Sequence, residues 1–214
     1  MATKIGVFNA ALIELGHRRL ADTGEAAEAA RELNALWTRV VSDCLSEASW
    51  NFAMETVKAT ADTGVTPEFG FTEVFAKPTD WLRTVAVSED EYFSLPLLHY
   101  YDDASFWSAN SSPIYVRYVS SDTGLGFELS RWSAAFTRYV ELEHAYRVCL
   151  KITQNAALKE QIGKDRDKAR KCAKNQDAMN EPQPKFAPAS GWTTARWGVG
   201  GSRRDRGSRG NLTG

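Results

Sequence analysis

The sequence predicts an α+β protein: a helical bundle made of N- and C-terminal helices, an inserted small β-rich region, and an extended basic C-terminal arm. Apolar residues recur at helical spacing near both ends of the chain. Strand-like alternation and prolines dominate the middle, and the last thirty residues show no amphipathic period. We therefore divide the chain into residues 1–50, 51–127, 128–182 and 183–214.

Two helices are expected in the first 50 residues. Gly16 would end the first helix. Asp22, followed three residues later by Glu25, resembles a capping box and predicts a second helix from about Gly24 to Ser49. The predicted apolar faces are Ile5, Phe8, Leu12 and Leu15 for the first helix, and Leu33, Leu36, Trp37, Val40, Val41, Cys44 and Leu45 for the second.

Residues 51–127 are predicted to be mostly strand and loop. Short apolar or alternating runs near 52–57, 82–87 and 114–119 indicate strands. Asp62-Thr63-Gly64 would end the first of them. Four prolines separate the runs, as expected for loop residues: Pro67, Pro78, Pro96 and Pro113.

Helical spacing returns at Ser130 and predicts a third helix, followed by a fourth from about Ala156 to Asp177. The fourth helix is mostly charged, which is typical of a solvated helix side, and Glu181-Pro182 would end it. The expected buried faces are Trp132, Phe136, Tyr139, Val140, Cys149 and Ile152 for the third helix, and Leu158, Ile162, Ala169, Cys172 and Ala173 for the fourth.

The three cysteines, Cys44, Cys149 and Cys172, are interpreted as reduced core thiols. Their number is odd, and no C-x-x-C pair is present to suggest a zinc or redox site. Charged residues interrupt the first twenty positions, so we expect no signal peptide. No apolar run reaches 18 residues, so no membrane span or membrane partner is expected.

Candidate catalytic motifs are present but have simpler interpretations. Asp-Thr-Gly, the tripeptide of aspartic proteases, occurs at 22–24, 62–64 and 122–124. Asp and Gly are common turn residues, so we interpret these copies as turns or caps. The acidic runs 89–91 and 102–103 have the residue types of a cation site or a glycosidase pair. Solvated surface charge is the favoured interpretation.

The histidines do not strengthen an enzymatic interpretation. His17, His99 and His144 are dispersed, without metal-ligand spacing, and each is interpreted as structural. We therefore expect no catalytic, cofactor-binding or metal-binding residues, and no enzyme. A hydrolase that acts on a cell-surface glycan or peptide remains an alternative. Aromatic residues of the middle region either stack on a sugar or protein partner or form a small core: Tyr92, Phe93, Tyr100, Tyr101, Phe106 and Trp107.

The arm is the strongest functional signal. Residues 185–214 carry six basic residues and one acid, whereas residues 1–184 carry a net charge of −6. Such a segment buries too little apolar surface to fold without a partner. It is interpreted as a nucleic-acid-binding tail, a charged disordered end, or an arm that embraces another subunit. Trp192 and Trp197 favour the last, since Trp and Arg are enriched at interface anchors.

Several motifs, in this order, resemble the tail tubular protein A family, the head-to-tail adaptors of short-tailed bacteriophages. The resemblance covers nearly the whole chain. It rests on Asn9-Ala10-Ala11-Leu12 with Leu15-Gly16 and Arg18-Arg19-Leu20; Trp50-Asn51-Phe52-Ala53; Phe75, Lys77-Pro78 and Asp80-Trp81-Leu82-Arg83-Thr84; the run Ile114 to Ser120; Leu129-Ser130-Arg131-Trp132; and Gly191-Trp192 before an Arg-rich end.

The resemblance implies a structural virion protein rather than an enzyme. Members form a twelve-subunit ring between the portal ring and the tail nozzle, and phage DNA passes through the lumen without sequence-specific contact. Assembly would occur in the cytoplasm of the bacterial host. The expected portal-binding residues of this chain are Trp192, Arg196, Trp197, Arg203, Arg204, Arg206 and Arg209.

Overall fold

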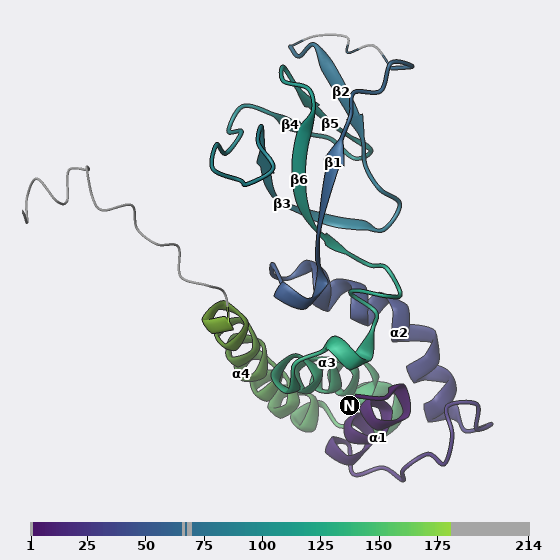
Figure 1. Ribbon diagram of the computed structural model, residues 1–214. Coiled ribbons are helices and arrows are strands. Elements are labelled where there is room, and N and C mark those ends of the chain that lie inside the picture. The colour runs from purple at the N-terminus through teal and green to yellow at the C-terminus, as the bar shows by residue number, and fades with distance from the viewer. Residues whose placement is uncertain (1, 66, 68–69, 181–214) are drawn as a thin grey trace, which may run out of the picture. The chain divides into compact units, whose positions relative to one another are not determined.

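The structure of this chain, a computed structural model, describes residues 2–65, 67 and 70–180. By their internal contacts, residues 1–180 form one unit. This unit is α+β: helices from both ends of it pack together, and two small antiparallel sheets are inserted between them in the chain (Figure 1). The predicted fold class is confirmed for these residues, and the predicted arm lies outside them.

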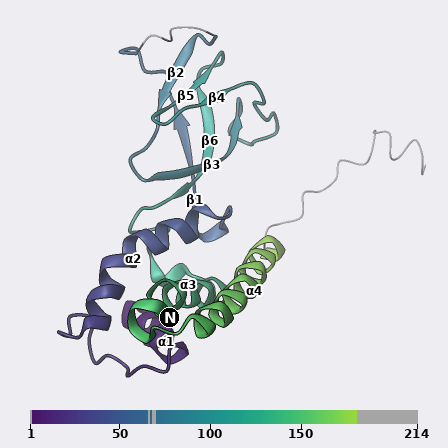
Figure 2. The ribbon, with the colours of Figure 1, turned by 180° about the vertical axis from the view of Figure 1, so that it is seen from behind.

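The helical part contains four α-helices within the described residues. They are α1 (Lys4–Glu14), α2 (Glu28–Ser46), α3 (Ala134–Thr153) and α4 (Ala156–Asn180). Helix α3 contacts the other three and packs most extensively along α4 (Figure 2). Its position explains its composition, since more of its residues are buried than those of any neighbouring helix.

Helix α1 ends just before Gly16, as the sequence predicts. The Thr3 hydroxyl accepts a hydrogen bond from the Gly6 amide at 3.1 Å and so caps the first turn. Gly16 follows the helix with a φ of +66°, a left-handed conformation that glycine adopts without steric cost. Asn9 then fixes the returning chain, because its side-chain amide exchanges two hydrogen bonds with the backbone of Leu20, at 2.7 and 3.1 Å.

The predicted capping box at the start of α2 is wrong. The helix begins at Glu28, and its N-cap residue, Ala27, makes no side-chain cap bond. Asp22 instead accepts the Gly24 amide in a turn, and the Glu25 carboxylate accepts the Ala21 amide. These two carboxylates accept backbone amides of the loop before the helix instead of capping a helical turn. The helix therefore starts later, at Glu28.

The third helix also starts later than predicted. Residues Leu129–Arg131 form a 3₁₀ turn, and Ser133 caps α3 by accepting the Phe136 amide at 3.1 Å. Trp132 therefore lies before the helix, where its indole nitrogen donates to the Gly126 carbonyl at 2.9 Å. Cys172 on α4 is exposed, so its predicted place in the core is wrong.

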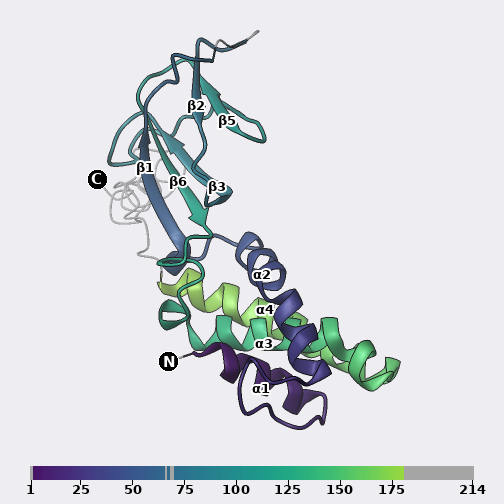
Figure 3. The ribbon, with the colours of Figure 1, turned by 90° about the vertical axis from the view of Figure 1, so that its right-hand side faces the viewer.

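The first sheet has the strand order β1 (Met54–Ala59), β6 (Ile114–Ser120) and β3 (Trp81–Ser88), all antiparallel (Figure 3). These strands match the three that the sequence predicts, although the first begins at Met54, after a 3₁₀ turn over Asn51–Ala53. Strand β6 lies in the middle and is the most buried of the three. Its alternating apolar pattern reflects that position.

The second sheet was not predicted. It joins β2 (Glu73–Ala76), β5 (Phe106–Ala109) and β4 (Tyr101–Asp102). The two sheets share a core in which Phe75, Trp107 and Val116 are buried. One hydroxyl connects them: Thr84 of β3 accepts the indole N–H groups of Trp81 at 3.1 Å and of Trp107, on β5, at 2.8 Å.

The β-rich region is attached to the helices at the base of β1 and β3. The Asn51 backbone amide donates to the Asp177 carboxylate at 3.1 Å, and its side-chain amide donates to the Asp177 carbonyl at 2.8 Å. The Arg83 guanidinium donates to the Ser49 hydroxyl at 2.9 Å. Val119 of β6 packs into the core cluster of the helices.

Candidate interaction surface

The residues predicted to bind a portal lie outside the described part of the chain. They are Trp192, Arg196, Trp197, Arg203, Arg204, Arg206 and Arg209. Within the described residues, the clearest candidate for partner recognition lies in the β-rich region, on the segment that connects β3 to β4.

This segment and the first residue of β4 expose four large apolar side chains, which we call the apolar loop surface. Tyr92 is 80% exposed, Leu95 63%, Leu98 88% and Tyr101 59%. Large apolar side chains gathered on one short segment indicate an interaction site, whereas single exposed ones are ordinary. The predicted aromatic run is therefore divided: Trp107 belongs to the core, and Tyr92 and Tyr101 face outward.

Asp90 holds the loop in shape. Its carboxylate accepts hydrogen bonds from the Ser88 hydroxyl at 2.6 Å, the Leu95 amide at 3.0 Å and the Ser94 amide at 3.1 Å. These bonds, led by the one from Ser88, lower the pKa of the Asp90 carboxyl to about 2. The sequence suggested only solvated acids here, yet this carboxylate organises the loop.

Further contacts anchor the loop to the first sheet. The Leu97 amide donates to the Val87 carbonyl at 2.9 Å. Phe93 has a φ of +56°, which is uncommon for a bulky residue, and its ring lies 4.6 Å below the Arg117 guanidinium. The exposed side chains are thus presented from a backbone that is fixed on both sides.

An apolar groove of about 590 Å³ lies beside one end of this surface. Tyr101 lines it together with Val74 and Phe106 of the second sheet, and with Asp103. Tyr101 therefore belongs to both the groove and the apolar loop surface. The groove extends the apolar area that the β-rich region offers to a partner.

The charge around this surface is strongly acidic. Residues 89–103 contain five carboxylates and no Lys or Arg. The whole β-rich region, residues 51–127, contains eleven acidic and four basic residues. One of the basic residues, Lys77, already has partners within the chain, since its ammonium group pairs with Asp102 and lies 3.5 Å above the Trp81 ring. A partner would need to offer basic groups around an apolar contact.

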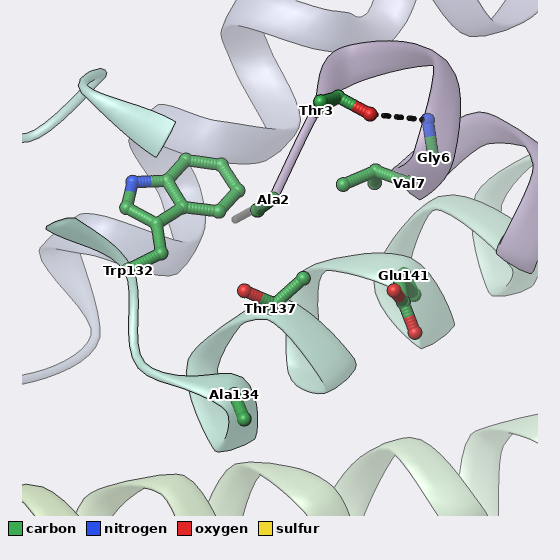
Figure 4. Close-up of a pocket in the computed structure, with 8 residues that line it drawn as sticks. All are labelled: Ala2, Thr3, Gly6, Val7, Trp132, Ala134, Thr137 and Glu141. Atoms are coloured by element: carbon green, nitrogen blue, oxygen red, sulfur yellow. Dashed lines mark hydrogen bonds between the residues drawn. The ribbon is translucent and has the colours of Figure 1, made fainter. Parts of the chain in front are cut away.

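A second hollow, of about 460 Å³, lies between α1 and the start of α3. Figure 4 shows Thr3 and Val7 of the α1 segment across from Thr137 and Glu141 of α3. The lining polar side chains already have partners: Thr3 caps α1, Thr137 donates to the Ser133 carbonyl, and Glu141 pairs with an arginine one turn away. Burial raises the pKa of the Glu141 carboxyl.

The candidate catalytic motifs are turns. In each Asp-Thr-Gly copy the aspartate accepts the amide of its own glycine, at 3.3 Å for Asp22, 2.9 Å for Asp62 and 2.7 Å for Asp122. The interpretation of these motifs as turn chemistry is confirmed. Among the described residues, no cluster of three or more His, Cys, Asp or Glu side chains has the arrangement of a metal site.

His144 is the histidine with the most unusual environment. It is fully buried against Phe8 and Trp37, and its Nδ1 lies 2.9 Å from the Val140 carbonyl oxygen. Its Nε2 has no hydrogen-bond partner among the described residues. Burial lowers the pKa of the imidazole to about 4. Its buried, packed position agrees with the interpretation of His144 as a structural residue.

The motifs that carry the family resemblance occupy structural positions. Asn9 fixes Leu20, the Trp50 indole donates to the Cys44 carbonyl at 2.9 Å, and Asn51 bonds Asp177. Asp80 accepts hydrogen bonds from the hydroxyls of Tyr118 and Ser120, two residues of β6. These residues set the turns and the joint between helices and sheets.

Comparison with known proteins leaves the family open. No protein-family model matches the chain, and no curated protein has a significantly similar sequence. In the described part of the chain, no helix has the length and hydropathy needed to cross a membrane.

Proposed function

We propose that this chain is a structural virion protein, a ring-forming adaptor that joins the portal to the tail nozzle of a short-tailed phage. In this proposal twelve copies surround the genome channel, and the basic arm of each copy docks on the portal. The ordered series of motifs supports it, and the observed α+β architecture is compatible with it.

The main structural support for the proposal is the apolar loop surface. The apolar loop surface, whose backbone is hydrogen-bonded to Asp90, exposes Tyr92, Leu95, Leu98 and Tyr101 to solvent. Holding four large apolar side chains in water is unfavourable unless a partner covers them. An assembly protein needs such a surface, and needs it already ordered, because pre-ordering lowers the entropic cost of association.

The arm would supply the second contact. It combines two indoles with five arginines, the side chains that most often anchor interfaces. Ordering an extended segment costs free energy on binding, so each arm alone would bind weakly. Twelve arms that engage one portal ring act together, and their combined affinity far exceeds that of one arm.

The test compares the full chain with a version that ends at residue 184. We expect the full chain to co-sediment with portal rings of the same phage and the truncated chain to remain in solution. Circular dichroism should show an equally folded body in both. Portal binding by the truncated chain at full strength would refute the role of the arm.

A variant pair separates an anchored arm from a purely electrostatic one. Trp192→Ala with Trp197→Ala keeps the charge, and Arg→Lys replacement at 203, 204, 206 and 209 keeps it as well. We expect the tryptophan variant to lose portal binding more than the lysine variant does. A DNA-binding tail would behave differently: both variants would bind DNA, and binding would weaken steeply with salt.

A further inference from the structure

A ring of identical copies needs two different surfaces on each chain. In a cyclic assembly each neighbour contact is head-to-tail, so one patch of a copy meets a different patch of the next. The inference below rests on the proposed function, since it concerns how ring neighbours meet. The described residues contain two exposed patches of opposite charge and complementary character.

The first patch is the apolar loop surface. Leu95 and Leu98 project from a loop whose shape Asp90 fixes, and Glu89 and Glu91 flank it as exposed carboxylates. Because the backbone is already ordered, docking would cost little conformational entropy. The five carboxylates within residues 89–103 restrict the choice of partner to a basic surface.

The second patch is the outer face of α4, defined here by Lys164, Lys168 and Lys171. These side chains are exposed and recur at the i, i+4, i+7 spacing of one helix face. Lys164 and Lys168 pair only with carboxylates of their own helix, and such exposed pairs contribute little. Lys171 makes no ion pair within the part of the chain that the structure describes.

An apolar contact is available near these lysines. Met179 lies two turns beyond Lys171 and is 84% exposed. Met is flexible and adapts to irregular apolar partners. Residues 159–174 contain seven basic and three acidic side chains, so this segment of α4 is net positive. The positive charge of this segment and the exposed Met179 side chain complement the acidic, apolar loop surface.

We propose that the apolar loop surface of one copy docks on the basic outer face of α4 of a second copy. The Glu89 and Glu91 carboxylates would face the lysine ammonium groups, and Leu98 would pack near Met179. A second copy is favoured because the complementary surface lies on this same chain, and because the acidic loop repels nucleic acid.

The test uses one variant for each patch. Leu95→Ser with Leu98→Ser removes the apolar contact, and charge reversal of Lys164, Lys168 and Lys171 to Glu removes the basic one. Each loss should weaken self-association of the full chain by about tenfold or more, measured by sedimentation equilibrium. Ile13→Ser, at an exposed apolar position on α1, is the matched control and should associate like the wild type.

Mixing the two variants makes the test specific. Each mutant retains the patch that the other lacks, so an equimolar mixture should form dimers but no larger species. A symmetric contact, or a contact through other surfaces, would not give this pattern. Monomers in the mixture would overturn the proposal, as would patch variants that associate like the wild type, or a wild type that stays monomeric at its highest soluble concentration.

An independent arm uses disulfide cross-linking in a Cys172→Ser background, because Cys172 is exposed whereas Cys44 and Cys149 are buried. In this background, Leu98→Cys with Met179→Cys should give a ladder of disulfide-linked oligomers under mild oxidation, because position 98 of one copy would lie near position 179 of the next. Leu98→Cys alone in the same background should give dimers at most. No ladder above the wild-type background would count against the proposal.

Portal binding, measured in parallel, separates this inference from the proposed function. The patch variants keep the arm, so they should still bind portal rings. If the full chain binds portal while both patch variants associate normally, the neighbour contact is wrong and the adaptor function stands. If the full chain fails to bind portal but shows the complementation pattern, the adaptor function is wrong and the contact stands.

Discussion

Asn51 and Asp177 lie 126 residues apart in the sequence and are joined by three hydrogen bonds. Asn51 precedes the first strand of the β-rich region, and Asp177 lies in the last turn of α4. An acid near a helix C-terminus is unfavourable for the helix dipole. The Asn51 backbone amide, which donates to the Asp177 carboxylate, explains why an acid lies there.

We expect Asp177→Ala to destabilise the protein by about 2 kcal/mol, because the Asn51 backbone amide loses the carboxylate that accepts its hydrogen bonds. Removing the unfavourable interaction between this acid and the helix dipole would offset the loss by a few tenths of a kcal/mol. Asn51→Ala keeps its backbone amide and should cost about half as much. Urea unfolding checks both. Asn175→Ala, on an exposed position of the same helix, is the control, and equal stability of all three variants would contradict the prediction.

The sequence predicts the helices and the first sheet because their signals are local. Apolar spacing marks α4, Gly16 marks the end of α1, and alternation marks β6. The second sheet gives no such signal. Strands β2 and β5 have four residues each, too short for a period, and they exist because they pair with each other over a shared core.

The candidate surface is predictable only in part. The aromatic and acidic composition of residues 89–103 indicates something unusual, but it does not say which side chains face solvent. That depends on Asp90, whose carboxylate gathers the amides of Ser94 and Leu95. The capping-box error at Asp22 and Glu25 has the same origin, since short polar side chains satisfy whichever nearby amides the fold presents.

Thr84 is expected to be the most sensitive polar residue of the β-rich region. Thr84→Val keeps shape and strand propensity but removes the acceptor of two indole N–H groups, one of them on the fully buried Trp107. We expect a loss of about 2 kcal/mol in the free energy of unfolding. Thr84→Ser should stay near wild type. Thr56→Val, on an exposed site of β1, controls for the substitution, and equal stability of the two valine variants would refute the role.

His144 should make stability depend on pH. Burial lowers its folded-state pKa to about 4, whereas an unfolded histidine titrates near 6.5. The unfolded chain therefore binds the extra proton first, and stability falls as pH drops from about 6.5 towards 4. From pH 7 to 4.5 the expected loss is about 2 to 3 kcal/mol.

The carboxylates should act at lower pH. Hydrogen bonding and pairing with Lys174 lower the pKa of Glu47 below 4.5, so its contribution is lost only below that pH. His144→Leu should therefore flatten the curve between pH 6.5 and 4.5 and leave the acid limb in place. Urea unfolding across this range measures it. A wild-type slope that survives in His144→Leu would show that another group is responsible.

Asp90 should control the order of the apolar loop without controlling the fold. Its carboxylate is half-buried at the surface and accepts hydrogen bonds from two backbone amides of the loop, so Asp90→Ala should raise hydrogen exchange of Ser94 and Leu95 by about tenfold and leave the urea midpoint unchanged. Because the pKa of this carboxyl is lowered to about 2, the wild-type loop should stay protected above pH 3.8 and lose protection as pH falls through about 2. Glu91→Ala is the neighbouring control, and equal exchange in both variants would show that the loop needs no such anchor. If the loop is pre-ordered for binding, the disordered variant must also associate more weakly, although Leu95 and Leu98 are still present.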